Sequence, residues 1–147
     1  MSRNQFYDAD LAYIHHTGFG DFATKAAPEL LKILKCHGIT RGTLLDLGCG
    51  SGIWARAAQN VGFHVIGIDQ SQAMIDLAQT VSPQSDFRCA SLHAADFPQC
   101  DVITAIGEAF SFLSAGPSLP LTALFRRLAN LQASDRLDSH RRHLCRG

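Results

Sequence analysis

An apolar run leads directly into three closely spaced glycines in the segment Thr43-Leu-Leu-Asp-Leu-Gly-Cys-Gly-Ser-Gly52. A second apolar run, His64-Val-Ile-Gly-Ile-Asp69, ends on a carboxylate. Glycine reaches backbone angles that other residues avoid and lets a ligand lie against the main chain, so these glycines fit a sharp strand-to-helix turn. The carboxylate of Asp69 can accept two hydrogen bonds from a ribose diol. The two runs therefore predict the site of a nucleotide cofactor.

The glycine spacing bears on which cofactor that site would bind. Dinucleotide-binding enzymes use G-x-G-x-x-G, whose third glycine allows close helix packing and whose helix N-terminus faces a pyrophosphate. Here the spacing is G-x-G-x-G, and Ile53 stands where that pattern has its third glycine. Asp46 lies two residues before the first glycine, where its charge would repel a pyrophosphate and attract a cation. These two residues disfavour an NAD-type dehydrogenase.

The same residues carry a family resemblance. The segment Leu45-Asp-Leu-Gly-Cys-Gly-Ser-Gly52 resembles the acid-x-G-x-G-x-G motif of the class I S-adenosylmethionine-dependent methyltransferases. Val65-Ile-Gly-Ile-Asp-Gln-Ser-Gln-Ala-Met74 is similar to the family's second strand and following helix, and Asp96-Phe-Pro-Gln-Cys-Asp-Val-Ile-Thr-Ala-Ile-Gly-Glu-Ala109 to its fourth strand. Three ordered segments with matching spacing are more specific than one glycine motif. The resemblance covers residues 6 to about 131.

The resemblance implies how S-adenosylmethionine would be held. Gly48 and Gly50 would line its methionine part, with Asp46 holding the amino group directly or through water. Asp69 would bind both ribose hydroxyls.

The adenine and the methyl group would lie farther along the chain. Gln70 and Met74 would border the adenine, although the position of Met74 fits a core residue better than a cofactor contact. The family often has Asp after its third strand to bind the adenine amino group, whereas this chain has Ser91 with Leu92 beside it, which weakens that contact. The end of the fourth strand, residues 105–108 beginning with Ala105, would face the sulfonium and the substrate.

Composition sets limits on the class of protein. The chain has 147 residues, of which 46% are hydrophobic and 18% charged, as expected for one globular domain. No apolar run approaches the roughly 18 residues of a membrane span, and the first residues lack the apolar core of a signal peptide. The five cysteines show neither C-x-x-C spacing nor an even count, which indicates reduced thiols and no zinc site. We expect a cytoplasmic protein without a metal ion.

Alternating patterns predict an α/β fold. Apolar residues recur at helical spacing near residues 27–34, 54–61, 71–81 and 120–128, and short apolar runs begin at Thr43 and cover 64–69, 87–90 and 102–106. Strands that alternate with helices imply a parallel sheet with right-handed crossovers. We therefore expect a Rossmann-like parallel sheet with flanking helices, incomplete in that it has strands 1 to 4 of the seven-stranded methyltransferase fold.

The two ends of the chain differ from this core. Residues 1–131 are expected to form a partial methyltransferase domain, with a helical or lid segment at 1–40, broken by Gly18 and Gly20, and a β-α-β core at 43–131. Residues 132–147 resemble nothing in the family, and we expect a disordered tail from a truncated or frame-shifted gene. Strand 4 would then form an open edge that invites self-association.

These features predict methyl transfer to a nucleophilic atom of a small molecule. No catalytic residue is assigned; the candidates for a base are Tyr7, His15, His16 and Glu108, each of which also fits a solvated position. His15 and His16 are adjacent and face different directions, so they are poor joint metal ligands. Nucleic acid is disfavoured as a partner because residues 1–125 carry 7 Lys and Arg against 11 Asp and Glu. The alternative is a truncated cofactor-binding module without turnover.

Overall fold

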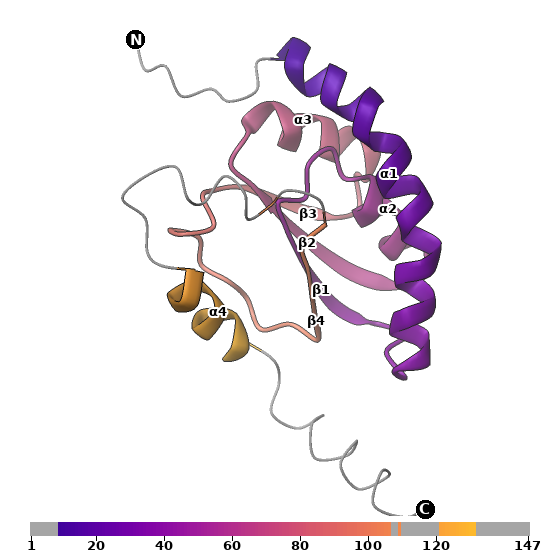
Figure 1. Cartoon of the computed structure of the whole chain (residues 1–147), viewed down its shortest axis with the longest axis vertical. Helices are drawn as coiled ribbons and strands as arrows, with labels where there is room; N and C mark the ends of the chain where they lie inside the picture. Colours follow the sequence, from indigo (N-terminus) through magenta and orange to yellow (C-terminus); the bar gives the residue numbers. More distant parts are fainter. Residues whose placement is uncertain (1–8, 107–108, 110–120, 132–147) are drawn as a thin grey trace, which may run out of the picture.

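The structure is a computed structural model that describes residues 9–106, 109 and 121–131. The described elements follow in the order α1 (Ala9–Cys36), β1 (Gly42–Leu47), α2 (Ile53–Asn60), β2 (Phe63–Asp69), α3 (Gln72–Val81), β3 (Asp86–Cys89), β4 (Val102–Thr104) and α4 (Leu121–Ala129). The strands form one parallel sheet in the order β3-β2-β1-β4 (Figure 1). Helices α1, α2 and α3 cover one face and α4 lies against the other. The predicted Rossmann-like parallel sheet with flanking helices is confirmed.

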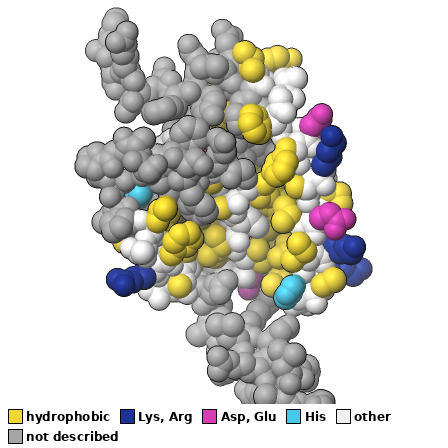
Figure 2. Space-filling model, in the orientation of Figure 1, with side chains coloured by type: hydrophobic (Ala, Val, Ile, Leu, Met, Phe, Trp, Pro, Cys, Tyr) yellow, Lys and Arg dark blue, Asp and Glu magenta, His cyan; other side chains and the backbone are white. Residues whose placement is uncertain are grey.

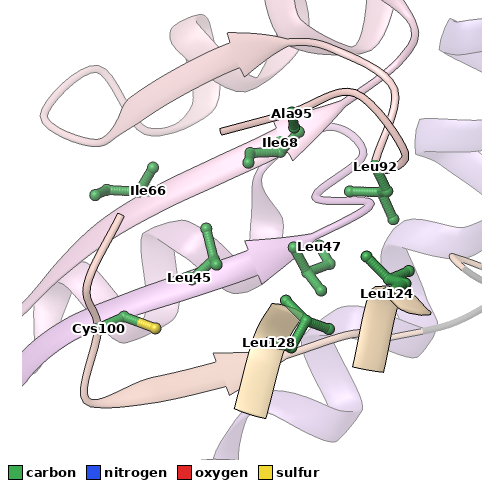
Figure 3. Packing of buried hydrophobic residues seen from close by; sticks show 9 residues of the cluster. All are labelled: Leu45, Leu47, Ile66, Ile68, Leu92, Ala95, Cys100, Leu124 and Leu128. Atoms are coloured by element: carbon green, nitrogen blue, oxygen red, sulfur yellow. The ribbon is translucent and has the colours of Figure 1, made fainter. Parts of the chain in front are cut away.

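The two central strands are buried on both faces. Leu44 and Val65 pair in register and contribute to a core with α1 and α2, which also contains Trp54. Alternate residues of the same strands point to the opposite face, as expected from the two-residue period of a strand. This second core is seen in Figure 3, where Leu45, Leu47, Ile66, Ile68, Leu92, Ala95, Cys100, Leu124 and Leu128 lie together. Burial on both faces explains why β1 and β2 read as almost continuous apolar runs.

Helix α1 is longer than the sequence indicated. Its predicted part is residues 27–34, with glycines breaking the chain upstream, but the helix runs from Ala9 to Cys36 and includes Pro28 in its interior. Packing explains the difference, because a Cβ on Gly20 would lie 3.0 Å from the side chain of Ile53, so the glycine lets α1 approach the start of α2. A glycine inside a helix costs about 1 kcal/mol, which is less than the stabilisation gained when the two helices bury apolar side chains against each other.

The outer face of α1 carries apolar side chains. The exposed ones are Tyr13, Ile14, Phe19, Phe22 and Ile33. Figure 2 shows hydrophobic side chains at the surface in the region where Figure 1 places this helix. More than half of the surface of each of these side chains is exposed. Among the described helices, none combines the length and apolar character needed to cross a membrane.

The remaining element boundaries agree with the sequence patterns to within two residues. Helix α3 begins after Ser71, whose Oγ accepts a hydrogen bond from the backbone N–H of Met74 (3.3 Å), as expected of an N-cap. Strand β4 ends at Thr104, two residues earlier than predicted, and it is the edge strand of the described sheet. The predicted tail, residues 132–147, lies outside the described residues.

Helix α4 fastens the loop between β3 and β4. The guanidinium of Arg127 donates hydrogen bonds to the carbonyls of Leu92 (3.5 Å), His93 (2.9 Å) and Ala95, and lies 4.7 Å from the ring centre of Phe97. On the same helix Leu124 and Leu128 are buried, whereas Leu121 and Phe125 are exposed. The apolar side chains of α4 are thus only partly covered.

We predict that Arg127→Met lowers the free energy of unfolding by about 1–3 kcal/mol, because the loop carbonyls lose a charged donor while an aliphatic side chain is retained. Urea denaturation followed by circular dichroism measures the change. Arg126→Met is the matched control, since Arg126 is exposed on the same helix. Equal stability of the two variants would contradict the assigned role of Arg127.

Candidate functional site

The glycine turn between β1 and α2 uses its three glycines in different ways. Gly48, Gly50 and Gly52 all have a positive φ, of 67°, 53° and 78°. A Cβ on Gly48 would lie 2.7 Å from the Cβ of Ala109, and one on Gly52 would lie 3.0 Å from Ala78. A Cβ on Gly50 would meet nothing within 4 Å. Two of the glycines are thus required by packing, and Gly50 marks the place where a ligand can approach the main chain.

Asp69, at the end of β2, supports this turn directly. Its Oδ2 accepts a hydrogen bond from the backbone N–H of Gly50 (3.0 Å), and its Oδ1 accepts one from the N–H of Ser71 (2.9 Å). A carboxylate has about four acceptor positions, so an acid that holds the turn in this way keeps the chemistry needed to bind a diol. The sequence predicted only the second of these roles.

Asp46 lies in β1 beneath the turn and is almost completely buried, with 2% of its surface exposed. Its Oδ1 accepts a hydrogen bond from the hydroxyl of Thr104 (2.7 Å), and that hydroxyl accepts one from the indole N–H of Trp54 (3.0 Å). Burial raises the pKa of Asp46 from its ordinary value of 3.8 to about 7; the Thr104 hydrogen bond lowers the pKa and the charge of Asp69 raises it further. The site thus holds a buried acid that titrates near neutral pH.

Thr104 and Trp54 were not singled out from the sequence. Asp46 and Thr104 are register partners in the paired strands β1 and β4, and Trp54 lies in the first turn of α2. The signal for Thr104 was a polar residue inside an apolar strand, but its partner depends on a register that the sequence does not reveal.

Cys49, inside the glycine turn, is not suited to nucleophilic chemistry. Burial raises the pKa of its thiol well above the ordinary value, and the charges of Asp46 and Asp69 add to this shift. Because the thiolate is the reactive form, the thiol stays protonated and unreactive. We therefore interpret Cys49 as a small side chain that the turn accommodates, not as a nucleophile.

Helix α1 reaches the turn through His16. Its Nδ1 lies 2.6 Å from the hydroxyl oxygen of Ser51, and Ser51 is buried between the second and third glycines. Of the four candidate bases, His16 is therefore the one whose side chain the structure locates at the turn. Tyr7, Glu108 and the side chain of His15 lie outside the described part of the chain.

The residues predicted to contact the adenine and the methyl group are more dispersed. Gln70 is exposed directly after Asp69, and Ala105 is exposed directly after β4. Ser91 is half-buried and Leu92 and Met74 are buried in the core, with 6% and 2% of their surfaces exposed. Contacts of these five residues with a ligand stay predictions. Within the described residues, no three His, Cys, Asp or Glu side chains form a group that could hold a metal ion.

Comparison with known families decides which class of protein carries this site. A family described as "Methyltransferase domain" matches residues 44–131, which include β1, the glycine turn, Asp69 and α4. The chain belongs to this family. The predicted resemblance to the class I methyltransferases is confirmed, as is S-adenosylmethionine as the cofactor of the family.

Curated relatives match about half of the chain. The 18S rRNA (guanine-N(7))-methyltransferase of Mus musculus is 34% identical over 83 residues, which are 55% of this chain and 30% of the relative. The ubiquinone biosynthesis O-methyltransferase of Bradyrhizobium diazoefficiens is 32% identical over 80 residues, 52% of this chain and 31% of the relative. The chain thus matches about a third of the length of these two proteins, and their acceptors differ in kind.

Solved structures share the fold. DesVI of Streptomyces venezuelae superposes with a TM-score of 0.69 at 16% identity, covering 86% of this chain and 55% of that one. DhpI, in complex with S-adenosylhomocysteine, gives 0.66 at 24% identity and covers 85% and 60%. Magnesium protoporphyrin IX methyltransferase of Synechocystis with bound S-adenosylmethionine gives 0.55 at 17%, covering 89% and 74%.

The raised pKa of Asp46 predicts how stability depends on pH. Between pH 3.8 and about 7 the folded state binds more protons at this group than the unfolded state, so the free energy of unfolding falls as pH rises through this window. About three pH units correspond to a loss of about 4 kcal/mol from this group alone. Asp46→Asn removes this contribution, and urea titrations of both proteins across the window measure the difference. Parallel curves for the two proteins would show that Asp46 does not titrate there.

Proposed function

We propose that this chain binds S-adenosylmethionine at the glycine turn and serves methyl transfer to a small-molecule nucleophile. The observation that carries the proposal is the open space over Gly50, bordered by Asp69, with the carboxylate of Asp46 buried beneath the turn. A ligand with a diol and a nearby cationic group matches these hydrogen-bond acceptors and their negative charges. The confirmed family supports the choice of cofactor.

The charge of the site supports a cationic ligand over a pyrophosphate. Asp46 and Asp69 are close enough for their charges to raise the pKa of Asp46, so a positive group between them would relieve their repulsion. A pyrophosphate at the same turn would add negative charge to it. The dinucleotide alternative is therefore disfavoured by charge as well as by the glycine spacing.

The protein's part in the reaction would be chiefly to bind and to orient. S-adenosylmethionine, when bound, supplies a methyl group on a positively charged sulfur that is already a good leaving group. Asp69 would hold the sugar and Asp46 the amino group. Because these two groups flank the sulfur, holding both would orient its methyl group toward the acceptor. The proton of the attacking nucleophile needs an acceptor, and His16 is our candidate because its ring lies at the turn.

The acceptor and the extent of the functional unit belong to the same proposal. We favour a small molecule because of the net negative charge of residues 1–125, although the relatives include an enzyme of ribosomal RNA. Residues 1–131 are the proposed cofactor-binding domain. Because β4 lies at the edge of the described sheet, a module that binds the cofactor without turnover, or self-associates through this edge, is the second candidate. A cytoplasmic location also remains a prediction.

Gly50→Ala tests where the ligand lies. The added methyl group meets no protein atom within 4 Å, so the variant should fold, at a cost of about 1–2 kcal/mol for the positive φ of 53°. We expect at least about tenfold weaker binding of S-adenosylhomocysteine in calorimetric titration, because the methyl group occupies ligand space. Gly18→Ala is the control, since Gly18 lies in α1 with open space around it. Wild-type affinity in Gly50→Ala would place the ligand elsewhere.

Asp69→Ala is expected to weaken binding of S-adenosylmethionine by about 1–3 kcal/mol, the usual cost of leaving polar partners unpaired. Stability should fall as well, because the N–H groups of Gly50 and Ser71 lose their acceptor. Calorimetry at a temperature where circular dichroism shows the variant folded separates the two effects. Unchanged affinity would remove Asp69 from the site, and tighter binding of NAD than of S-adenosylmethionine would revive the dehydrogenase.

A further inference from the structure

Two hydrogen bonds beneath the glycine turn link Trp54, Thr104 and Asp46 in series, and we call this series the relay. An indole N–H can only donate, so the hydroxyl of Thr104 accepts from Trp54 at 3.0 Å. That leaves the hydroxyl proton of Thr104 to be donated to Asp46 Oδ1 at 2.7 Å. The direction Trp54 to Thr104 to Asp46 is therefore fixed by the chemistry of its first member.

This polarity favours one state of the acid. An ionised Asp46 accepts the hydrogen bond from the Thr104 hydroxyl, and the donors of Trp54 and Thr104 then both have acceptors. A carboxyl protonated on Oδ2 could still accept this hydrogen bond at Oδ1, but the bond is stronger to a charged acceptor, so the donation from Thr104 favours the ionised form. Burial and the charge of Asp69 favour the neutral acid, and the Thr104 hydrogen bond opposes them. The Thr104 hydrogen bond thus lowers the pKa of Asp46, whereas burial and the charge of Asp69 raise it.

The relay also restricts where the carboxylate can point. Oδ1 is held by Thr104, whereas Oδ2 makes no hydrogen bond to the described residues although the side chain is almost fully buried. The three members come from β1, β4 and α2, and Trp54 is itself buried with 3% of its surface exposed. Asp46 is therefore fixed in its orientation, with one oxygen left for a ligand.

We propose that Thr104, backed by Trp54, is a positioning residue that keeps Asp46 ionised and aimed at the ammonium group of the cofactor's methionine part. This inference rests on the proposed cofactor site and adds to it two residues that would not touch the ligand. Other groups that face Asp46 are Asp69 at the end of β2 and the Cys49 thiol in the turn, and His16 of α1 lies at the same turn. In contrast to these groups, Thr104 donates a hydrogen bond to the carboxylate of Asp46.

The test compares two ligands and two substitutions. S-adenosylhomocysteine carries the ammonium group, whereas 5′-methylthioadenosine has the same adenine, ribose and sulfur without it. Thr104→Val keeps the branched shape suited to a strand but removes the donor, and Thr104→Ser keeps the donor. Calorimetric titrations from about pH 5.5 to about pH 8.5 follow binding through the window in which Asp46 titrates.

We expect Thr104→Val to weaken S-adenosylhomocysteine binding at neutral pH by about fivefold, and to move the pH at which affinity is half-lost upward by about one unit. Affinity should recover at higher pH, which general damage to the site would not produce. Binding of 5′-methylthioadenosine should change by less than about twofold. Thr104→Ser should resemble the wild type, and Trp54→Phe should give a smaller shift in the same direction.

A measurement without ligand separates this inference from the proposed function. In the free Thr104→Val protein, the pH at which stability stops falling should also rise by about one unit. If the wild type fails to bind S-adenosylhomocysteine, the proposed function is wrong, and this measurement still decides whether Thr104 controls Asp46. The inference is overturned if both pH profiles match those of the wild type, or if both ligands are weakened equally at every pH.

Discussion

The parallel pairing of β1 with β2 is the constraint on which the site depends. The backbone N–H groups of Gly48 and Cys49 both donate to the carbonyl of Ile68, at 2.8 Å and 3.1 Å, so the turn is bonded to the last part of the neighbouring strand. One residue farther on, Asp69 reaches back to the N–H of Gly50. The carboxyl ends of parallel strands meet at one edge of the sheet. The pairing therefore brings the carboxylate of Asp69 next to the uncovered backbone of Gly50.

The pairing of β1 with β4 explains why an acid is tolerated inside the core. Asp46 alternates with Leu45 and Leu47, so it shares the face of Leu44, which is packed under α1 and α2. Such a position would normally hold an apolar side chain, because an unpaired buried charge is costly. One hydrogen bond from Thr104 offsets only part of that cost, which is why the pKa remains near neutrality. A cationic ligand would offset the rest of the cost of burying this carboxylate. The buried charge that destabilises the free protein would then also attract the ligand.

Much of this arrangement could be predicted from the sequence, because it depends on local patterns. The apolar runs, the glycine turn and the Ser71 cap each have a signature within a few residues, and the structure places them as expected. The extent of α1 could not be predicted, because Gly18 and Gly20 suggest a break when the contact with Ile53 is unknown. The relay was missed for a similar reason: Thr104 and Asp46 are 58 residues apart, and only the register of β1 with β4 brings them together.

That register is itself supported by residues at the start of the two strands. The carboxylate of Asp101 accepts a hydrogen bond from the N–H of Thr43 at 2.9 Å, while the N–H of Asp101 donates to the carbonyl of Thr43 at 2.8 Å. Gly42, with a φ of 128°, leaves the space for this carboxylate, since a Cβ there would lie 2.3 Å from it. The two-way contact holds the start of β4 against β1, which is needed because a strand of three residues has few ladder bonds of its own. The position of Thr104 beneath the glycine turn therefore depends on a glycine and an acid at the opposite end of the same strands, where neither residue would contact a ligand at the turn.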